Sequence, residues 1–312
     1  MTQALLFPGQ GAQSIGMGKD LADNFPAARA VFEEVNEALG QDLSDLIWNG
    51  EIDQLTLTEN AQPALMATSV AAARALTAEG ADLTKASFIA GHSLGEYSAL
   101  CASGAISLAD TARLLRIRGK AMQAAVPVGV GAMAAILGLD FATVTEIAKT
   151  ASGDEVCQAA NDNDPGQVVV SGHKGAVERA VELAKEAGAK RAILLPVSAP
   201  FHCALMQPAA DAMAAALADV VVSAPNVPLI ANVRADVVTD GALIKTLLVE
   251  QVTGSVRWRE SVEFMSAQGV SEVFEIGAGK ALSGMVRRVD REIAVNAVGD
   301  ADGVRAAAEK LG

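Results

Sequence analysis

Short apolar runs alternate with longer amphipathic stretches along most of the chain. Apolar runs bounded by Gly or Pro, as at residues 4–7 and 87–90, predict buried strands, and the stretches that follow them have the apolar spacing of helices. In the first and last thirds of the chain the remaining strands are expected at 227–231, 272–276 and 293–297. The helices expected there are 18–39, 62–79, 94–103, 107–125, 205–217, 241–252, 261–268 and 280–289. This alternation is typical of an α/β fold with a mostly parallel sheet.

The pattern changes between residues 127 and 198. Strands are expected at 132–137, 156–160, 167–171 and 191–196, helices at 141–151 and 175–187, and a polar turn at 161–166. The order βαββαβ is that of a ferredoxin-like unit. We therefore predict an α/β-hydrolase-like large domain made of residues 1–126 and 199–312, with a small ferredoxin-like domain inserted at 127–198.

Composition narrows the class of protein. The chain has 312 residues, of which 51% are hydrophobic, enough for a large core. A net charge of −13 without a basic tract argues against nucleic acid as a partner. The apolar run at 126–139 is interrupted by Gly and Pro, and the N-terminus lacks the pattern of a secretion signal. Three cysteines without metal-type spacing fit a cytoplasmic protein without a disulfide framework. We expect no membrane association and a monomer.

The segment Gly91-His92-Ser93-Leu94-Gly95 fits the pattern G-x-S-x-G. An apolar strand is expected before it and a helix after it, which is the context of a nucleophile elbow. In that turn the serine Oγ lies at a helix N-terminus, and the N–H of Leu94 becomes one oxyanion donor. Ser93 is therefore predicted as a nucleophile. The alternative is a serine that only caps the helix.

A serine nucleophile needs a base, and the chain has only three histidines. His92 is adjacent to Ser93 on the same turn, so its side chain is expected to point elsewhere. His173 falls in the inserted unit just after a strand, where a capping or surface role is expected. By elimination His202, at the return to the large domain, is the predicted base, and a structural histidine is the alternative. No acid to orient it is obvious, so a backbone carbonyl or an amide is left for that role.

Basic side chains at two places indicate anionic ligands. Arg116 and Arg118 differ by two positions on a predicted helix, so one can face the cleft and bind a carboxylate while the other faces solvent. A surface salt bridge is the alternative for Arg118. The segment 280–291 carries Lys280, Arg287, Arg288 and Arg291 and could contact an acidic carrier protein or form an ordinary solvated face.

Glycine-rich segments give no support to a nucleotide cofactor. Residues 7–11 (FPGQG) and 277–280 (GAGK) fit neither a P-loop nor a dinucleotide-binding pattern. The first of them could instead place backbone N–H groups near the elbow.

Taken together, these motifs resemble the bacterial malonyl-CoA:acyl carrier protein transacylase family. The resemblance extends from residue 2 to about residue 300. It rests on FPGQGAQSIGMG, ENAQPALMATS, AGHSLGEYSAL, RIRGKAMQ, VGVGAMAAILG, NDPGQVVVSGHK, AKRAILLPVSAPFHCALM and FEIGAGKALSGM.

The resemblance implies roles for particular residues. Ser93 would carry a malonyl ester, His202 would activate it, and Arg118 would bind the malonyl carboxylate. The N–H groups of Gln10 and Leu94 would form the oxyanion hole.

Five further positions are implied in the same way. The Gln251 carbonyl would orient the histidine. Gln62 and Asn161 would line the cleft between the domains, and Met122 would form a wall of the acyl pocket. Phe201, before the histidine, accompanies malonyl in related polyketide acyltransferases.

The implied reaction moves a malonyl group from malonyl-CoA to the phosphopantetheine thiol of acyl carrier protein in two steps, for fatty acid synthesis. Coenzyme A thioester is a substrate, and no cofactor or metal is needed. The residues alone leave three alternatives: a serine hydrolase or thioesterase, a polyketide acyltransferase with another extender unit, and a non-enzymatic carrier-binding module.

Overall fold

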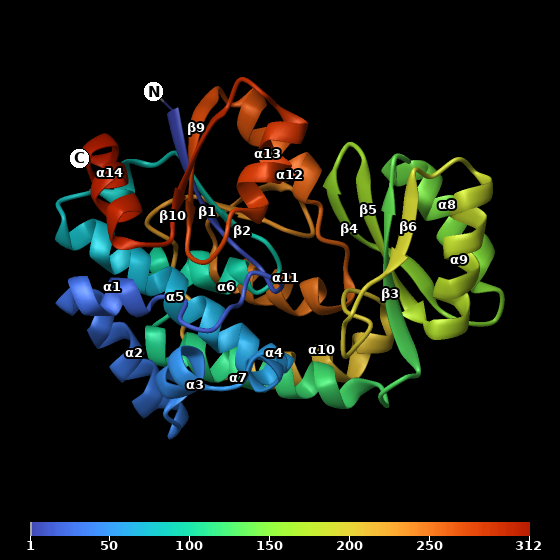
Figure 1. Ribbon diagram of the computed structural model, residues 1–312, viewed down its shortest axis with the longest axis horizontal. Coiled ribbons are helices and arrows are strands. Elements are labelled where there is room, and N and C mark those ends of the chain that lie inside the picture. The colour runs from blue at the N-terminus through green and yellow to red at the C-terminus, as the bar shows by residue number, and fades with distance from the viewer. Residues whose placement is uncertain (1) are drawn as a thin grey trace.

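The computed structural model describes residues 2–312. A six-stranded sheet forms the centre of the larger part of the molecule, and a separate four-stranded sheet forms the smaller part (Figure 1). The chain leaves the large part after α7 (Leu108–Ala125), builds the small sheet, and returns to the large part before α10 (Gln207–Ala218). The expected fold class, a large α/β part with a second, antiparallel sheet, is confirmed.

The large sheet has the strand order β10-β9-β1-β2-β7-β8. Its strands are β1 (Thr2–Phe7), β2 (Phe88–Gly91), β7 (Leu229–Ala231), β8 (Asp236–Val238), β9 (Val270–Ile276) and β10 (Ala294–Val298). All neighbours pair in parallel except β7 and β8. The edge strand β8 was not expected from the sequence.

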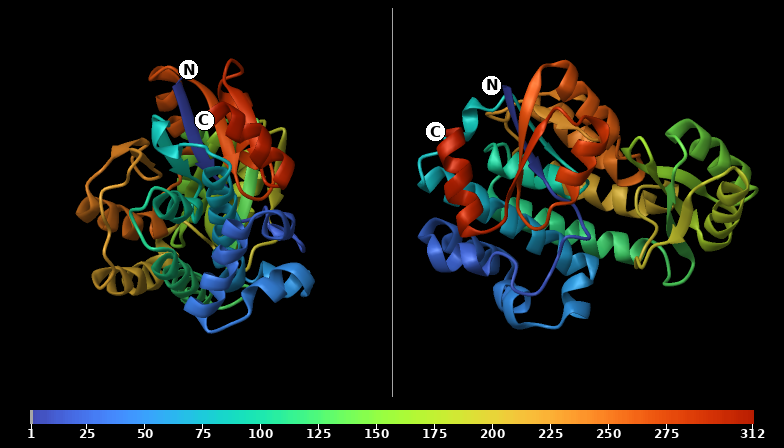
Figure 2. Two further views of the ribbon diagram at one scale, coloured as in Figure 1. Left: turned by 90° about the vertical axis from the view of Figure 1, so that its left-hand side faces the viewer. Right: turned by 45° about the horizontal axis from the view of Figure 1, so that its top comes forward.

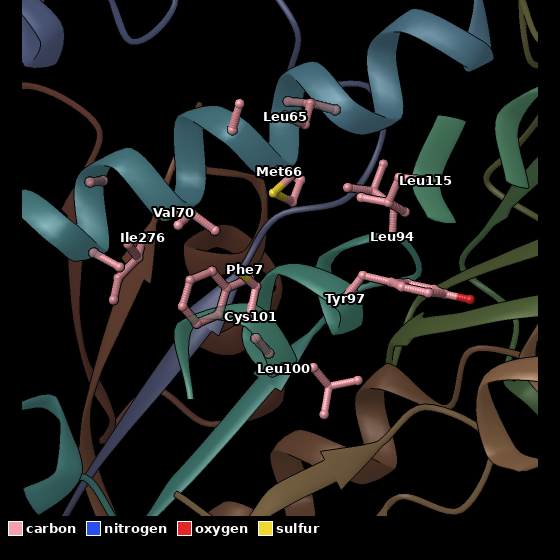
Figure 3. Packing of buried hydrophobic residues seen from close by; sticks show 14 of the residues in the cluster. Phe7, Leu65, Met66, Val70, Leu94, Tyr97, Leu100, Cys101, Leu115 and Ile276 are labelled. Carbon is pink, nitrogen blue, oxygen red and sulfur yellow. The ribbon is translucent and has the colours of Figure 1, made fainter. Parts of the chain in front are cut away.

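Helices cover both faces of this sheet. Leu5 and Phe7 of β1 point into one core and Ala4 and Leu6 into another, as the period of two of a strand requires. The first core is shared with α1 (Lys19–Asn24), α2 (Pro26–Leu39), α5 (Thr58–Ala78), α6 (Gly95–Ala102), α7, α10, α11 (Gly241–Thr253) and α14 (Ala301–Leu311). The second is shared with α12 (Trp258–Ala267) and α13 (Ala281–Val289). Figure 3 shows Phe7 packed between α5 and α6. Strand β1 pairs in parallel with β2, the strand that leads into the elbow.

The small sheet is antiparallel throughout, in the order β4-β5-β3-β6. Its elements are β3 (Gly131–Leu137), α8 (Phe141–Ser152), β4 (Cys157–Asp164), β5 (Gln167–His173), α9 (Lys174–Glu186) and β6 (Arg191–Leu194). Both helices pack on the face turned away from the large part (Figures 1 and 2). We propose that the domain junctions lie near 126–127 and 198–199, in the segments that follow α7 and β6.

The expected polar turn at 161–166 is wrong. Strand β4 continues to Asp164, so only Pro165 and Gly166 remain for the turn. The side chains of Asp162, Asn163 and Asp164 are buried, and each has a polar partner in the large part of the molecule. Buried polar groups need such partners, and the partners come from distant segments that a local pattern cannot reveal.

Three further differences concern helices. The helix expected at 18–39 is interrupted at Phe25, because Pro26 can begin a helix but not continue one. Helix α5 begins four residues before the expected Gln62 and contains Pro63. The helices α3 (Leu43–Asn49), α4 (Ile52–Thr56) and α14 were not expected. Of the helices in residues 2–312, none has the length and apolarity to cross a bilayer.

Candidate active site

Ser93 lies on a sharp turn between β2 and α6. Its φ is +54°, a region that residues with a side chain rarely adopt. A Cβ on Gly91 would lie 2.0 Å from the Gly95 carbonyl carbon, and a Cβ on Gly95 would lie 2.2 Å from the Phe7 oxygen. Strand, turn and helix therefore approach each other too closely here for a side chain at either glycine.

Asn232, directly after β7, fixes this turn from both sides. Its Oδ1 accepts the Ser93 N–H at 2.8 Å, and its Nδ2 donates to the Gly91 carbonyl at 2.7 Å. Asn232 is fully buried. It was not among the residues predicted from the sequence, although a polar residue at the carboxyl end of a parallel strand is a signal that could have revealed it.

His202 lies against Ser93 across the cavity. Its Nε2 is 2.7 Å from Ser93 Oγ, and its Nδ1 is 2.8 Å from the Gln251 carbonyl oxygen. A carbonyl only accepts, so Nδ1 carries the proton and the Nε2 lone pair faces the serine hydroxyl. Burial, assisted by the charge of Arg118, lowers the pKa of His202 to about 3. The imidazole is therefore neutral at pH 7, the form that a general base needs.

The imidazole rings of the two other histidines have partners other than the Ser93 hydroxyl. His92 Nε2 lies 2.9 Å from Asn163 Oδ1 of β4, and burial lowers the pKa of His92. His173 Nδ1 accepts the Val156 N–H at 2.9 Å within the small sheet. The pair formed by His92 and Asn163, which joins the elbow to the small sheet, was not predicted.

Arg118 reaches the nucleophile from α7. Its side chain is 1% exposed, Nη1 donates to Gln62 Oε1 at 2.8 Å, and Nη2 donates to Gln251 Oε1 at 2.9 Å. Nη2 also lies 3.2 Å from Ser93 Oγ. Arg116 instead donates to the side-chain oxygens of Asn60 and of the exposed Gln41. Of the two arginines left open by the sequence, Arg118 is the one in the site.

The charge of Arg118 has no ion-pair partner within residues 2–312. The buried carboxyl of Glu96 is connected to Arg118 through Gln251: its Oε2 accepts the Gln251 Nε2–H at 2.9 Å and the Asn232 N–H at 3.1 Å. Burial raises the pKa of Glu96 to about 7 and lowers that of Arg118. An unpaired buried cation is costly, so this site favours an anionic ligand.

One cavity of about 540 Å³ collects the predicted residues, a volume suited to a small organic ligand. All the predicted site residues except Gln251 line it: Gln10, Gln62, Ser93, Leu94, Arg118, Met122, Asn161, Phe201 and His202. Gln251 lies behind Ser93 and reaches the site through its carbonyl and its amide. Apolar side chains also line the cavity, among them Met133 and Val169 of the small sheet and Met285 of α13.

Gln10 and Leu94, the two residues expected to supply backbone N–H groups to an oxyanion, both line this cavity. Within residues 2–312 neither backbone N–H group donates a hydrogen bond to another protein group. The Gln10 side chain is fixed by the Thr58 hydroxyl, which donates to its Oε1 at 3.0 Å. Two free donors beside a nucleophile are the arrangement that stabilises an oxyanion.

Possible metal ligands do not gather in the site. Among the residues that the structure describes, no three His, Cys, Asp or Glu side chains form a group that could hold an ion.

The raised pKa of Glu96 predicts a pH effect on stability. A carboxyl whose pKa rises on folding, here from 4.5 to about 7, contributes stability below pH 4.5 that is lost as the pH rises through 7. The wild type should therefore lose on the order of 2–3 kcal/mol of unfolding free energy relative to Glu96→Gln across this window. His202 titrates in both proteins, so its contribution cancels. Urea unfolding at several pH values measures the difference, and a pH-independent difference would contradict the assignment.

Comparison with known proteins places this site in a family. The model of the acyl transferase domain family matches residues 4–301. The malonyl CoA-acyl carrier protein transacylase of Escherichia coli strain K12 is 47% identical over 310 residues, which are 99% of this chain and 100% of that protein.

Solved structures agree over the same length. The acyl-carrier-protein-S-malonyltransferase of Bartonella henselae is 58% identical with a TM-score of 0.98 and covers 100% of this chain and 99% of its own. A malonyl-transacylase in complex with its type II polyketide synthase acyl-carrier protein is 43% identical with a TM-score of 0.96, over 99% and 100% of the two chains. The chain therefore belongs to the acyl transferase domain family and, within it, to the malonyl CoA-acyl carrier protein transacylases.

Proposed function

We propose that this enzyme transfers a malonyl group from malonyl-CoA to the phosphopantetheine thiol of an acyl carrier protein, in the cytoplasm and for fatty acid synthesis. The observation that carries the proposal is the convergence on Ser93 Oγ of His202 Nε2 at 2.7 Å and Arg118 Nη2 at 3.2 Å. A nucleophile, a base and a cation that can bind a carboxylate thus meet in one cavity. All of them come from one chain, and we propose a monomer.

In the first step Ser93 Oγ attacks the thioester carbonyl while His202 Nε2 takes the hydroxyl proton. The carbonyl oxygen becomes an oxyanion that the N–H groups of Gln10 and Leu94 stabilise. The tetrahedral intermediate collapses, the C–S bond breaks, and the coenzyme A sulfur leaves with the proton returned by His202. The product is a malonyl ester of Ser93.

In the second step the carrier thiol gives its proton to His202 and attacks the same carbonyl carbon. The C–O bond of the ester breaks, and His202 returns the proton to Ser93 Oγ. The Gln251 carbonyl holds the imidazole in one tautomer through both steps, and its Nδ1–H contact lets it stabilise the imidazolium that forms. Coenzyme A enters only as part of the substrate, and we propose no further cofactor.

Arg118 has donors left for the malonyl carboxylate. A guanidinium carries five N–H groups, and the contacts to Gln62, Gln251 and Ser93 use three of them. Among the described residues the Nε–H has no partner. A charge-assisted bond to a carboxylate would satisfy it in a buried site.

Gln62, Met122, Asn161 and Phe201 line the same cavity as Ser93 and Arg118. We propose that they fix the space available beyond the carboxylate and so the size of acyl group that the pocket accepts.

The fate of the malonyl group tests the proposal against a hydrolase. Malonyl-CoA is incubated with enzyme and holo carrier protein, and malonyl-carrier and free malonate are measured together. Transfer should exceed hydrolysis by a large factor. Malonate as the main product, unaffected by the carrier, would favour the hydrolase. An equal or faster reaction with another extender thioester would favour the polyketide alternative.

We propose that the carrier docks on the basic surface formed by Lys280, Arg287, Arg288 and Arg291. It lies on and beside α13, whose inner face contributes Met285 to the cavity. Arg288 already pairs with Asp164 at 2.6 Å. The three other cations have no ion pair among the described residues, so their charges are free to attract an acidic carrier protein.

Charge reversal at Lys280 and Arg287 is expected to raise the KM for carrier protein severalfold to about tenfold, because attraction across the rim of an interface speeds association. The rate of Ser93 acylation by malonyl-CoA should stay unchanged. Lys149→Glu reverses one charge on α8, which packs on the outer face of the small sheet, and is the control for each single reversal. Carrier kinetics equal to those of the control would exclude this surface.

A further inference from the structure

Two glutamine amides hold the guanidinium of Arg118. Gln62 Oε1 accepts from Nη1 at 2.8 Å, and Gln251 Oε1 accepts from Nη2 at 2.9 Å. The two ends of an amide have nearly the same shape, but only the oxygen end can accept from a guanidinium. A turned amide would place N–H against N–H and push the guanidinium away. The position of Arg118 therefore depends on whatever fixes the orientation of the two amides.

Thr58 fixes the first amide. Gln62 Nε2 donates to Thr58 Oγ1 at 2.9 Å, one helical turn earlier on α5. The Thr58 hydroxyl gives its own hydrogen to Gln10 Oε1 at 3.0 Å, so its lone pairs face Gln62. Thr58 is 1% exposed and does not line the cavity.

Glu96 fixes the second amide. Gln251 Nε2 donates to Glu96 Oε2 at 2.9 Å and also to the Ser93 carbonyl at 3.0 Å. The Glu96 oxygen is held in turn by the Asn232 N–H at 3.1 Å. Glu96 is 1% exposed and, like Thr58, is not part of the cavity wall.

We propose that Thr58 and Glu96 are positioning residues that set the affinity of the enzyme for carboxylate-bearing acyl groups. They act through Gln62 and Gln251, whose amide oxygens hold Arg118 where a carboxylate can meet it. The inference rests on the proposed function, in which Arg118 binds the malonyl carboxylate. It assigns selectivity to two side chains that do not contact the substrate.

The same contacts connect the carboxylate site with the oxyanion hole. Gln10, which borders the oxyanion position, is hydrogen-bonded to Thr58, and Thr58 is bonded to Gln62. A change at Thr58 is therefore expected to have its larger effect on the half-saturating concentration of malonyl-CoA and a smaller effect on the maximal acylation rate.

Four variants test the proposal. Thr58→Val keeps the shape of the side chain and removes the hydroxyl, whereas Thr58→Ser keeps the hydroxyl. Glu96→Leu removes the acceptor, whereas Glu96→Gln keeps a carbonyl oxygen. Thr68→Val is the control, because Thr68 is a buried threonine of the same helix whose hydroxyl, among residues 2–312, bonds only to the Ala64 carbonyl, at 3.0 Å.

The readout is the acylated fraction of enzyme, by rapid quench and intact-protein mass, over a range of malonyl-CoA or acetyl-CoA concentrations. Thr58→Val and Glu96→Leu should raise the half-saturating malonyl-CoA concentration by roughly tenfold to a hundredfold, since small displacements of a ligand-positioning group have effects of that order. Acylation by acetyl-CoA should change much less. The serine and glutamine variants should stay within about threefold of wild type, and the control should equal it.

The outcomes separate this inference from the proposed function. No malonyl adduct on wild type would overturn both. A wild-type adduct together with unchanged half-saturation in Thr58→Val and Glu96→Leu would overturn the inference alone, as would a parallel loss of malonyl and acetyl acylation. If Glu96→Leu does not fold, as judged by its circular dichroism, Thr58→Val decides, because it removes one hydroxyl and no charge.

Discussion

Replacement of Ser93 or of His202 by alanine is expected to lower kcat/KM for malonyl transfer by at least about 10⁴-fold in each case. Without the hydroxyl no ester can form, and without the imidazole the hydroxyl proton has no acceptor. The two groups act as one unit across a contact of 2.7 Å. The kcat/KM of the double variant should therefore be no lower than that of the less active single variant, because neither group is useful alone.

The measurement is steady-state transfer to holo carrier protein, with malonyl-CoA binding followed separately for each inactive variant. Binding should persist, since Arg118 remains in place. His92→Ala is a poor control because His92 contacts Asn163 at the elbow. His173→Ala removes a histidine of the small sheet and should keep full activity. Multiplicative losses in the double variant would show that Ser93 and His202 act independently, contrary to the proposal.

Replacement of Arg118 by alanine is expected to lower kcat/KM for malonyl-CoA by roughly 10³-fold, because a site built to bind a charged group discriminates strongly when the partner is lost. Acetyl-CoA has no carboxylate, so its already slow reaction should change by less than about tenfold. Lysine should not restore the activity. A single ammonium cannot donate in a fixed geometry to Gln62, Gln251 and a carboxylate together.

The control is Arg116→Ala, which removes the same side chain two positions away on α7, where it contacts the amides of Asn60 and Gln41 outside the cavity. The ratio of malonyl-CoA to acetyl-CoA reactivity is the quantity to compare. Equal losses for the two thioesters in Arg118→Ala would mean that the arginine supports the fold of the elbow rather than recognition of the carboxylate.

Much of the fold was predictable because its signals are local. The elbow glycines, the strand before Ser93 and the βαββαβ order all follow from short patterns, and the structure confirms them. The buried polar stretch of β4 was predicted as a turn because its partners, Arg259 and Arg288, lie more than 90 residues away in sequence. Local composition carries no information about such pairs.

The candidate site divides in the same way. Ser93 and His202 could be proposed from a motif and from the small number of histidines. Roles for Gln62 and Gln251 came only from the resemblance. Asn232, Thr58 and Glu96 were missed, because their importance lies in hydrogen bonds that join separate elements. Thr58 was also missed because the start of α5 was predicted at Gln62. Thr58, one turn before Gln62, then lay outside the predicted helix.

The most direct test of the proposed chemistry is intact-protein mass spectrometry after brief mixing with malonyl-CoA, followed by addition of holo carrier protein. The proposal predicts one malonyl adduct on the wild type, located on Ser93 by peptide mapping and absent in Ser93→Ala, whereas acetyl-CoA should give a much smaller adduct under the same conditions. The adduct should disappear as malonyl-carrier forms. Rapid malonyl transfer without any adduct, or an adduct on another residue, would contradict the covalent serine mechanism.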